Sequence, residues 1–177
     1  MKRESDTEIE RAGEKRLIIL SLQPQPYGLI MQGIKKHEFR RKFLDTSVNA
    51  FIYVSSPVKA IKAYIEFDAP IVDEVDPIGR IAEQEGSGTL SGITAYMKGL
   101  KTGYAIPIRS FREIEPLTLE ELTNTYHFTA PQSYIFADSR PELKEELLRR
   151  LHIDGEVSDD RRIYSTHSRS ISGITHR

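Results

Sequence analysis

The sequence predicts an α+β domain built on a small, mostly antiparallel sheet or barrel. Segments with strand character recur along the chain at irregular spacing, and short helix-like segments interrupt them. No internal repeat is present. A chain of 177 residues is long enough for one domain with a substantial buried core.

The N-terminal part predicts strands around one short helix. Residues 17–22 form an apolar run typical of a strand, and Pro26 suits the first turn of a helix. Gly33 is a typical helix stop. Residues 37–42 are short and charged, which favours a strand at a rim, whereas residues 49–56 are rich in β-branched and aromatic side chains and predict a strand.

Residues 61–67 fit two local structures. Ile61, Ala63, Ile65 and Phe67 alternate with more polar positions, which is the period of a strand with one buried face. Ile61 and Ile65 are also four apart, as on a helix. The composition favours a strand.

The C-terminal part alternates helices with short strands. Strands are expected at residues 103–109 and 133–136, and Pro107 places the first of them at an edge or a bulge. Helices are predicted at residues 76–85, 91–98 and 141–150, with another beginning at a capping box formed by Thr118 and Glu121.

The chain is expected to comprise a charged leader at residues 1–16, a domain at 17–150 and a flexible polar tail at 151–177. No apolar run approaches the length of a membrane-spanning helix, and the charged N-terminus is unlike a signal peptide. We therefore expect a cytoplasmic protein without a membrane partner. The oligomeric state is not set by the sequence.

Composition excludes several kinds of site. The chain has no cysteine, which removes disulfides, thiol nucleophiles and thiolate zinc sites. The histidines lack the spacing of metal ligands, so we expect neither a metal nor another cofactor. The net charge of −1 argues against a globally basic nucleic-acid coat protein, so any anion site must come from a local patch.

Residues 35–42 form such a patch. They contain five cationic side chains and one carboxylate, Glu38, next to an apolar strand. So many charges need a hydrated site or an anionic partner. If this segment is extended, Glu38 and Arg40 point to one face, whereas Phe39 and Arg41 point to the other.

Three ordered segments resemble the ASCH family, a branch of the PUA-like superfamily. They are residues 20–24, 33–40 and 52–57, and the second carries the signature G-x-K-x-x-E-x-R at Gly33, Lys35, Glu38 and Arg40. The resemblance implies a small pseudo-β-barrel of mixed, mostly antiparallel strands with short helices packed around it. A cleft is expected between the barrel and the helix after the first strand. Family members are proposed to bind RNA or nucleotides there, some bacterial members deacetylate N4-acetylcytidine, and at least one is described as a ribonuclease.

The amidohydrolase residues of that family carry over in part. The catalytic lysine falls on Lys35, and the catalytic threonine falls on Glu38, which removes the hydroxyl of that reaction. The catalytic glutamate follows Ala-Glu-Gln in those enzymes, and the same letters at residues 82–85 make Glu85 its counterpart. Lys35, Glu38 and Glu85 are thus the predicted catalytic residues.

A ligand site follows from the same residues. Lys35, Arg40 and Arg41 are predicted to clamp a phosphate, and Glu38 to accept a hydrogen bond from a nucleobase edge. The direction of Lys35, at the bend between helix and strand, does not follow from the pattern. Ser55, Ser56, Gln132 and Ser133 are expected to line the same cleft if their strand ends converge. Tyr27, Tyr53 and Tyr104 are candidate stacking platforms.

These residues support three functional hypotheses. The leading one is a nucleic-acid or nucleotide-binding module, RNA-directed, with RNA or a nucleotide or nucleoside as its ligand. The alternative is a small metal-independent hydrolase of a modified nucleoside or of RNA, in which Glu38 or Glu85 activates water beside Lys35. The third is a regulator of translation or transcription with a small ligand in its cleft. The alternative in which Lys35, Glu38 and Arg40 have no functional role is that they form a surface ion-pair cluster at a strand edge.

Overall fold

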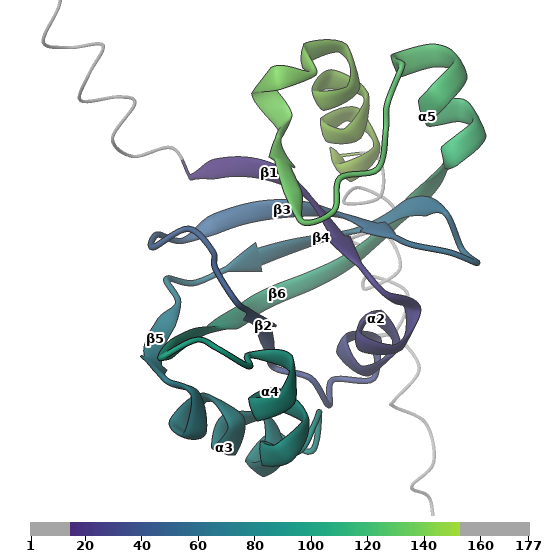
Figure 1. Ribbon diagram of the computed structural model, residues 1–177. Coiled ribbons are helices and arrows are strands. Elements are labelled where there is room, and N and C mark those ends of the chain that lie inside the picture. Colours follow the sequence, from purple (N-terminus) through teal and green to yellow (C-terminus); the bar gives the residue numbers. More distant parts are fainter. Residues whose placement is uncertain (1–14, 153–177) are drawn as a thin grey trace, which may run out of the picture.

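The computed structural model describes residues 15–152, whose strands form one strongly curled sheet (Figure 1). Within these residues the sheet has seven strands in the order β2-β6-β4-β3-β1-β7, and β5 pairs with β6. The β1–β3 pair is parallel, and the other pairs are antiparallel. The strands are β1 (Arg16–Leu22), β2 (His37–Arg40), β3 (Val48–Val54), β4 (Ala60–Phe67), β5 (Ile71–Glu74), β6 (Thr102–Thr118) and β7 (Tyr134–Phe136). The predicted mixed, mostly antiparallel half-barrel is confirmed.

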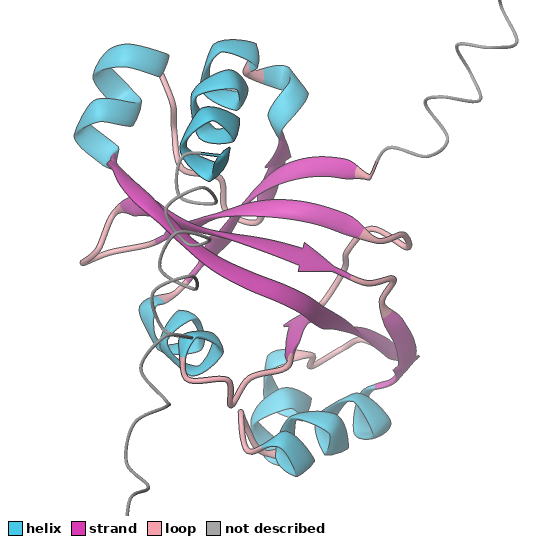
Figure 2. Ribbon diagram, turned by 180° about the vertical axis from the view of Figure 1, so that it is seen from behind, coloured by secondary structure: helices cyan, strands magenta, loops and turns pink. Residues whose placement is uncertain are grey.

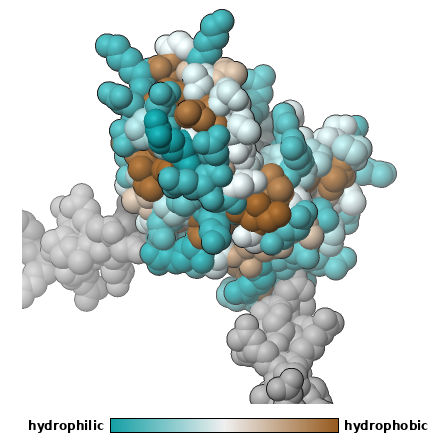
Figure 3. All heavy atoms as spheres, turned by 90° about the horizontal axis from the view of Figure 1, so that it is seen from below, coloured by the Kyte–Doolittle hydropathy of each residue, from teal (hydrophilic) through white to brown (hydrophobic). Residues whose placement is uncertain are grey.

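Short helices cover both sides of this sheet (Figure 2). One group contains α5 (Leu119–Tyr126) and a helix at residues 141–152, and the other contains α2 (Pro24–Met31), α3 (Val75–Glu85) and α4 (Leu90–Tyr96). A single 3₁₀ turn, η1 (Ala137–Ser139), follows β7. Seen from the end that carries α3 and α4, the surface is mostly hydrophilic, with hydrophobic groups in separate patches (Figure 3).

The alternation of β1 divides the core between the two groups of helices. Ile18 and Leu20 pack with Ile30 of α2 on one face, while Ile19 packs on the other face with Leu122 of α5 and the helix at residues 141–152. Successive side chains of a strand point to opposite faces, so an apolar strand such as β1 is buried on both. This double burial fixes the C-terminal end of β1, where the candidate site begins.

A third apolar cluster holds α3 and α4 against the edge of the sheet. Phe39 of β2 and Ala105 of β6 pack there against Ile78, Ala82 and Met97. The two helices approach closely at Gly79, where an added Cβ would lie 2.6 Å from a Leu90 methyl group. The cluster thus joins the helices to β2, the strand that carries the charged motif.

The strand predicted at residues 103–109 is longer and more central than expected. β6 runs to Thr118, and its Ala105 pairs with Phe39 of β2 on one side and with Ile71 of β5 on the other. From Ile108 onward β6 pairs with β4, with a register shift between Ile108 and Ser110. The edge position expected for this strand is therefore wrong, and the irregularity that was the alternative lies just after Pro107, between Ile108 and Ser110. β5 was not predicted, because its four residues are exposed and carry no alternating pattern.

Residues 61–67 belong to strand β4, as their composition favoured, so the helical alternative is wrong. The predicted leader at 1–16 and tail at 151–177 lie outside the described residues, apart from two residues at each boundary. Among residues 15–152, no helix has the length and apolar character needed to cross a membrane.

Candidate functional site

The end of α2 brings Lys35 into the interior. The Leu29 carbonyl accepts hydrogen bonds from the backbone N–H groups of both Ile34 and Lys35, at 3.0 and 3.1 Å. Gly33, with φ of 71°, takes the left-handed conformation that this reversal requires. The ammonium of Lys35 then lies 4.4 Å from the centroid of the Phe39 ring. The turn thus directs inward a side chain whose direction the sequence pattern did not give.

Glu38 lies between two cations. Its Oε2 is 3.5 Å from Lys35 Nζ, and its Oε1 is 2.9 Å from Arg40 Nε. The side chains of Lys35 and Glu38 are 7% exposed, and that of Arg40 is 12% exposed. Glu38 and Arg40 meet because they are two residues apart on β2 and share a face, as predicted. We call these three residues the buried charge triad.

Arg40 also closes the curl of the sheet. One of its terminal nitrogens donates to the carbonyl of Ser21 at 2.8 Å. Ser21 belongs to β1, whereas Arg40 belongs to β2 at the far end of the strand order. Only a curled sheet brings these two strands within reach of one side chain.

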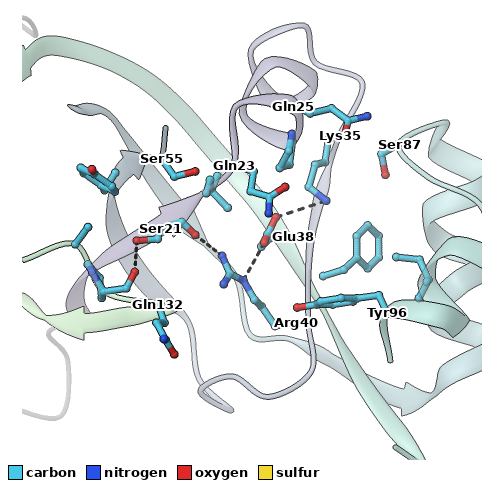
Figure 4. Close-up of a pocket in the computed structure, with 17 residues that line it drawn as sticks. Ser21, Gln23, Gln25, Lys35, Glu38, Arg40, Ser55, Ser87, Tyr96 and Gln132 are labelled. Carbon is cyan, nitrogen blue, oxygen red and sulfur yellow. Dashed lines mark hydrogen bonds and ion pairs between the residues drawn. The ribbon is translucent and has the colours of Figure 1, made fainter. Parts of the chain in front are cut away.

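A pocket of about 710 Å³ opens between these strands, α2 and α4 (Figure 4). This volume is within the range of cavities that bind small ligands. Its walls contain the whole charge triad together with Ser55 and Gln132. The other lining residues are Ser21, Leu22, Gln23, Gln25, Pro26, Phe39, Tyr53, Ser87, Ile93, Tyr96, Ala130 and Pro131.

The hydrogen bonds of the triad are incomplete. Glu38 Oε2 and Arg40 Nε are both buried and have no hydrogen-bond partner among residues 15–152. The Arg40 Nε contact to Glu38 is therefore an ion pair by distance without hydrogen-bond geometry. Buried polar groups in folded proteins are nearly always hydrogen-bonded, so these two atoms, which have ion-pair contacts only, are an exception in the wall of the pocket.

Four of the predicted site residues do not line this pocket. Arg41 is not among the lining residues and donates to the backbone carbonyl of Tyr96 at 2.7 Å. Ser56 is exposed in the turn after β3, and the Ser133 carbonyl accepts from the Ser21 N–H at 2.9 Å. The fourth is Glu85.

Glu85 is engaged by its neighbours beside the pocket. Its Oε2 is 2.8 Å from His37 Nδ1 and accepts from the Lys36 backbone N–H at 3.3 Å, while its Oε1 accepts from the Ser87 hydroxyl. This carboxylate ties the end of α3 to β2. Within residues 15–152, no three His, Asp or Glu side chains converge as metal ligands.

The three tyrosines proposed as stacking platforms lie in different places. Tyr53 lines the pocket but is only 3% exposed, and its ring packs 5.8 Å from that of Phe128. Burial raises the pKa of Tyr53 above its ordinary value, so its phenol is neutral at physiological pH. Tyr27 is buried against the sheet and donates to Glu113, and Tyr104 bonds Asp45; neither lines the pocket.

Sequence reasoning missed several polar or aromatic lining residues. Gln23 and Gln25 enter at the start of α2, Ser87 in the loop after α3, and Tyr96 at the end of α4. The glycine-flanked Ser87 and the prolines around Gln25 mark turns but do not indicate which elements the turns face.

Comparison with known sequences gives one relative. No protein-family model matches the sequence. A curated relative from Zymomonas mobilis, named ASCH domain-containing ribonuclease, is 25% identical over 123 residues, which cover 68% of this chain and 83% of that protein.

Solved structures share the architecture. The crystal structure of ASCH from Zymomonas mobilis superposes with a TM-score of 0.67 at 24% identity, covering 77% of this chain and 96% of that one. The N-terminal domain of Staphylothermus marinus McrB gives a TM-score of 0.52 at 10% identity, covering 78% of this chain and 96% of that one. The chain is thus similar in sequence to an ASCH domain-containing protein and shares the half-barrel fold of the Zymomonas mobilis ASCH structure, which supports the resemblance to the ASCH family.

Proposed function

We propose that this protein is RNA-directed and holds one nucleotide of an RNA in the pocket around the buried charge triad. The observation that carries the proposal is the triad itself: two cations and one carboxylate, nearly excluded from solvent, in the wall of a nucleotide-sized pocket. The relative named a ribonuclease supports the choice of RNA.

The charges of the triad suit a nucleotide. Lys35 and Arg40 outnumber Glu38, so the site carries an excess positive charge that a phosphate would complement. Glu38 Oε2, which makes an ion pair with Lys35 but no hydrogen bond, is a candidate acceptor for a base amino group or a ribose hydroxyl. One acceptor beside two cations thus fits a base or ribose joined to a phosphate.

A purely structural role explains these residues less well. Buried ion pairs are often no more stabilising than apolar side chains of the same volume, because removing charges from water is costly. The triad also borders a cavity and leaves two polar atoms without hydrogen bonds. A ligand that supplies the missing contacts gives a reason for this arrangement.

Replacing Lys35 by methionine should weaken binding of a short single-stranded RNA by about 10-fold, because a charge-assisted hydrogen bond to phosphate is lost. The slope of log affinity against log salt should also fall in magnitude by about 0.7. Fluorescence anisotropy at several potassium chloride concentrations measures both quantities.

Lys36→Met is the matched control, because it removes the same charge from the neighbouring, exposed position. It should reduce affinity far less than Lys35→Met. Equal losses in the two variants would indicate diffuse surface attraction, and no RNA binding by the parent protein would refute the proposal.

A second candidate function is cleavage of the bound RNA, which the name of the curated relative favours. In this reaction Glu38 would take the proton from the attacking hydroxyl or water as the attacking oxygen bonds to phosphorus. The bond from phosphorus to the 5′-oxygen of the next nucleotide would break, that oxygen would take a proton from water, and Lys35 would stabilise the charge that develops on the phosphate. Glu38 Oε2 lies 3.5 Å from Lys35 Nζ, so the proposed base and the proposed cation would act side by side.

If the protein cleaves RNA, Glu38→Gln should lower the cleavage rate by about 100-fold, since an amide cannot accept the proton. Glu85→Gln is the control: the Glu85 carboxylate is outside the pocket wall, so this variant should stay within a few-fold of the parent. Gel analysis of a labelled RNA, with and without EDTA, measures the rates. A larger loss in Glu85→Gln than in Glu38→Gln would assign the base to Glu85 instead.

A further inference from the structure

Tyr96 differs from the other aromatic residues of the pocket in its exposure. It lines the pocket at the end of α4, yet it remains 45% exposed. Tyr53 and Phe39, which also line the pocket, are 3% and 7% exposed, and Phe39 lies beneath the Lys35 ammonium. Figure 4 shows the Tyr96 ring on the α4 side, with its hydroxyl directed toward the side that carries Arg40. The pocket therefore presents an open aromatic face at its mouth.

The backbone beneath Tyr96 is held from both sides. Arg41 donates to its carbonyl at 2.7 Å, and Met97, the next residue, is 1% exposed in the cluster that joins α4 to β2. The ring is thus presented on a fixed backbone. A stacking surface gains from such fixation, because less conformational freedom is lost when a ligand binds.

Two exposed cationic residues lie at the backbone of this end of α4. Arg41 also donates to the carbonyl of Lys98 at 3.4 Å, so the backbone of Lys98 lies beside the Arg41 guanidinium. Both side chains are exposed. An aromatic face next to a cationic surface is the combination that proteins use to bind single-stranded nucleic acid.

We propose that Tyr96 is the stacking platform for a nucleobase, and that the ligand class of this pocket is single-stranded RNA with an unpaired base. The inference rests on the proposed function and deepens it. The base stacks on Tyr96, its phosphate meets Lys35 and Arg40, and the flanking phosphates pass over Arg41 and Lys98. A base inside a duplex keeps both faces covered by its neighbours, so duplex RNA does not fit this site.

The chain contains no tryptophan, so Tyr96→Trp introduces a single fluorescent reporter that keeps an aromatic face. A short single-stranded RNA should quench this fluorescence on binding. A strand with the same phosphates but abasic sugars should bind more weakly and leave the fluorescence nearly unchanged, and an RNA duplex should do the same.

Affinity measurements complete the test. Tyr96→Ala should weaken binding of the single strand by about 10-fold, the typical effect of removing one stacked aromatic residue, whereas Tyr96→Phe should bind like the parent. Phe136→Ala removes another exposed aromatic ring that is not part of the pocket, and it should leave affinity unchanged.

The outcomes separate the two proposals. If Lys35→Met weakens binding while Tyr96→Ala does not, or if abasic or duplex RNA binds as well as the single strand, the stacking role is refuted and the RNA site stands. If the parent protein binds none of these RNAs, the proposed function fails and the stacking role fails with it.

Discussion

Replacing Glu38 by alanine should lower the free energy of unfolding by about 3–5 kcal/mol, the usual cost of removing one partner from a buried ion pair. Glu38 is the one carboxylate of the triad, and its loss leaves the Lys35 and Arg40 charges close together with little access to water. Urea denaturation monitored by circular dichroism measures the change. A loss below about 1 kcal/mol, typical of surface ion pairs, would show that water reaches the triad freely.

A triple variant distinguishes an unpaired charge from a gap in the packing. Lys35→Met, Glu38→Leu and Arg40→Met together remove every charge while keeping most of the side-chain volume. Buried ion networks replaced in this way are often neutral or more stable, so the triple variant should recover most of the stability lost in Glu38→Ala. It should also bind RNA very weakly. A triple variant that is stable but no longer binds RNA would show that the three charges serve the ligand and not the fold.

Replacing Phe39 by alanine should also cost about 3–5 kcal/mol, the range for truncating a buried aromatic residue. The Phe39 side chain, which belongs to β2, packs against Ala105 of β6 and the apolar faces of α3 and α4. The same change removes the ring beneath the Lys35 ammonium, so RNA affinity should fall together with stability. Denaturation and anisotropy measurements on one preparation test both effects.

Phe39→Leu separates these two roles. Leucine restores much of the apolar volume, so the loss of stability should be below about 1.5 kcal/mol. It offers no aromatic face, so the support of the Lys35 charge, about 1 kcal/mol for such contacts, should still be missing. We expect an affinity several-fold below that of the parent. Parent-like affinity in Phe39→Leu would show that the ring only fills space.

The parts of the fold that the sequence predicted are those fixed by local chemistry. The apolar run of β1, the stop at Gly33 and the alternation along β4 depend on neighbouring residues alone, and each matches the structure. The alternation of side chains along a strand also predicted that Glu38 and Arg40 share one face of β2, and there they form an ion pair.

What the sequence could not give depends on contacts between distant segments. The parallel pairing of β1 with β3 and the bond from Arg40 to Ser21 exist only once the sheet is curled. Tyr96 enters the pocket because Met97 anchors α4 in a cluster with Phe39, more than fifty residues earlier in the chain. Arg41 was predicted to share the phosphate clamp although strand alternation placed it on the face opposite Glu38 and Arg40, and in the structure it donates to the Tyr96 carbonyl.

The length of β6 limits how this protein can change over evolution. One strand of 17 residues carries the partner of the charged motif and, beyond a register shift between Ile108 and Ser110, the partner of β4. An insertion or deletion of a single residue upstream of Pro107 would exchange the inward and outward side chains of one half relative to the other. Lineages of this domain should therefore vary in length in the loops, and hardly ever within this strand.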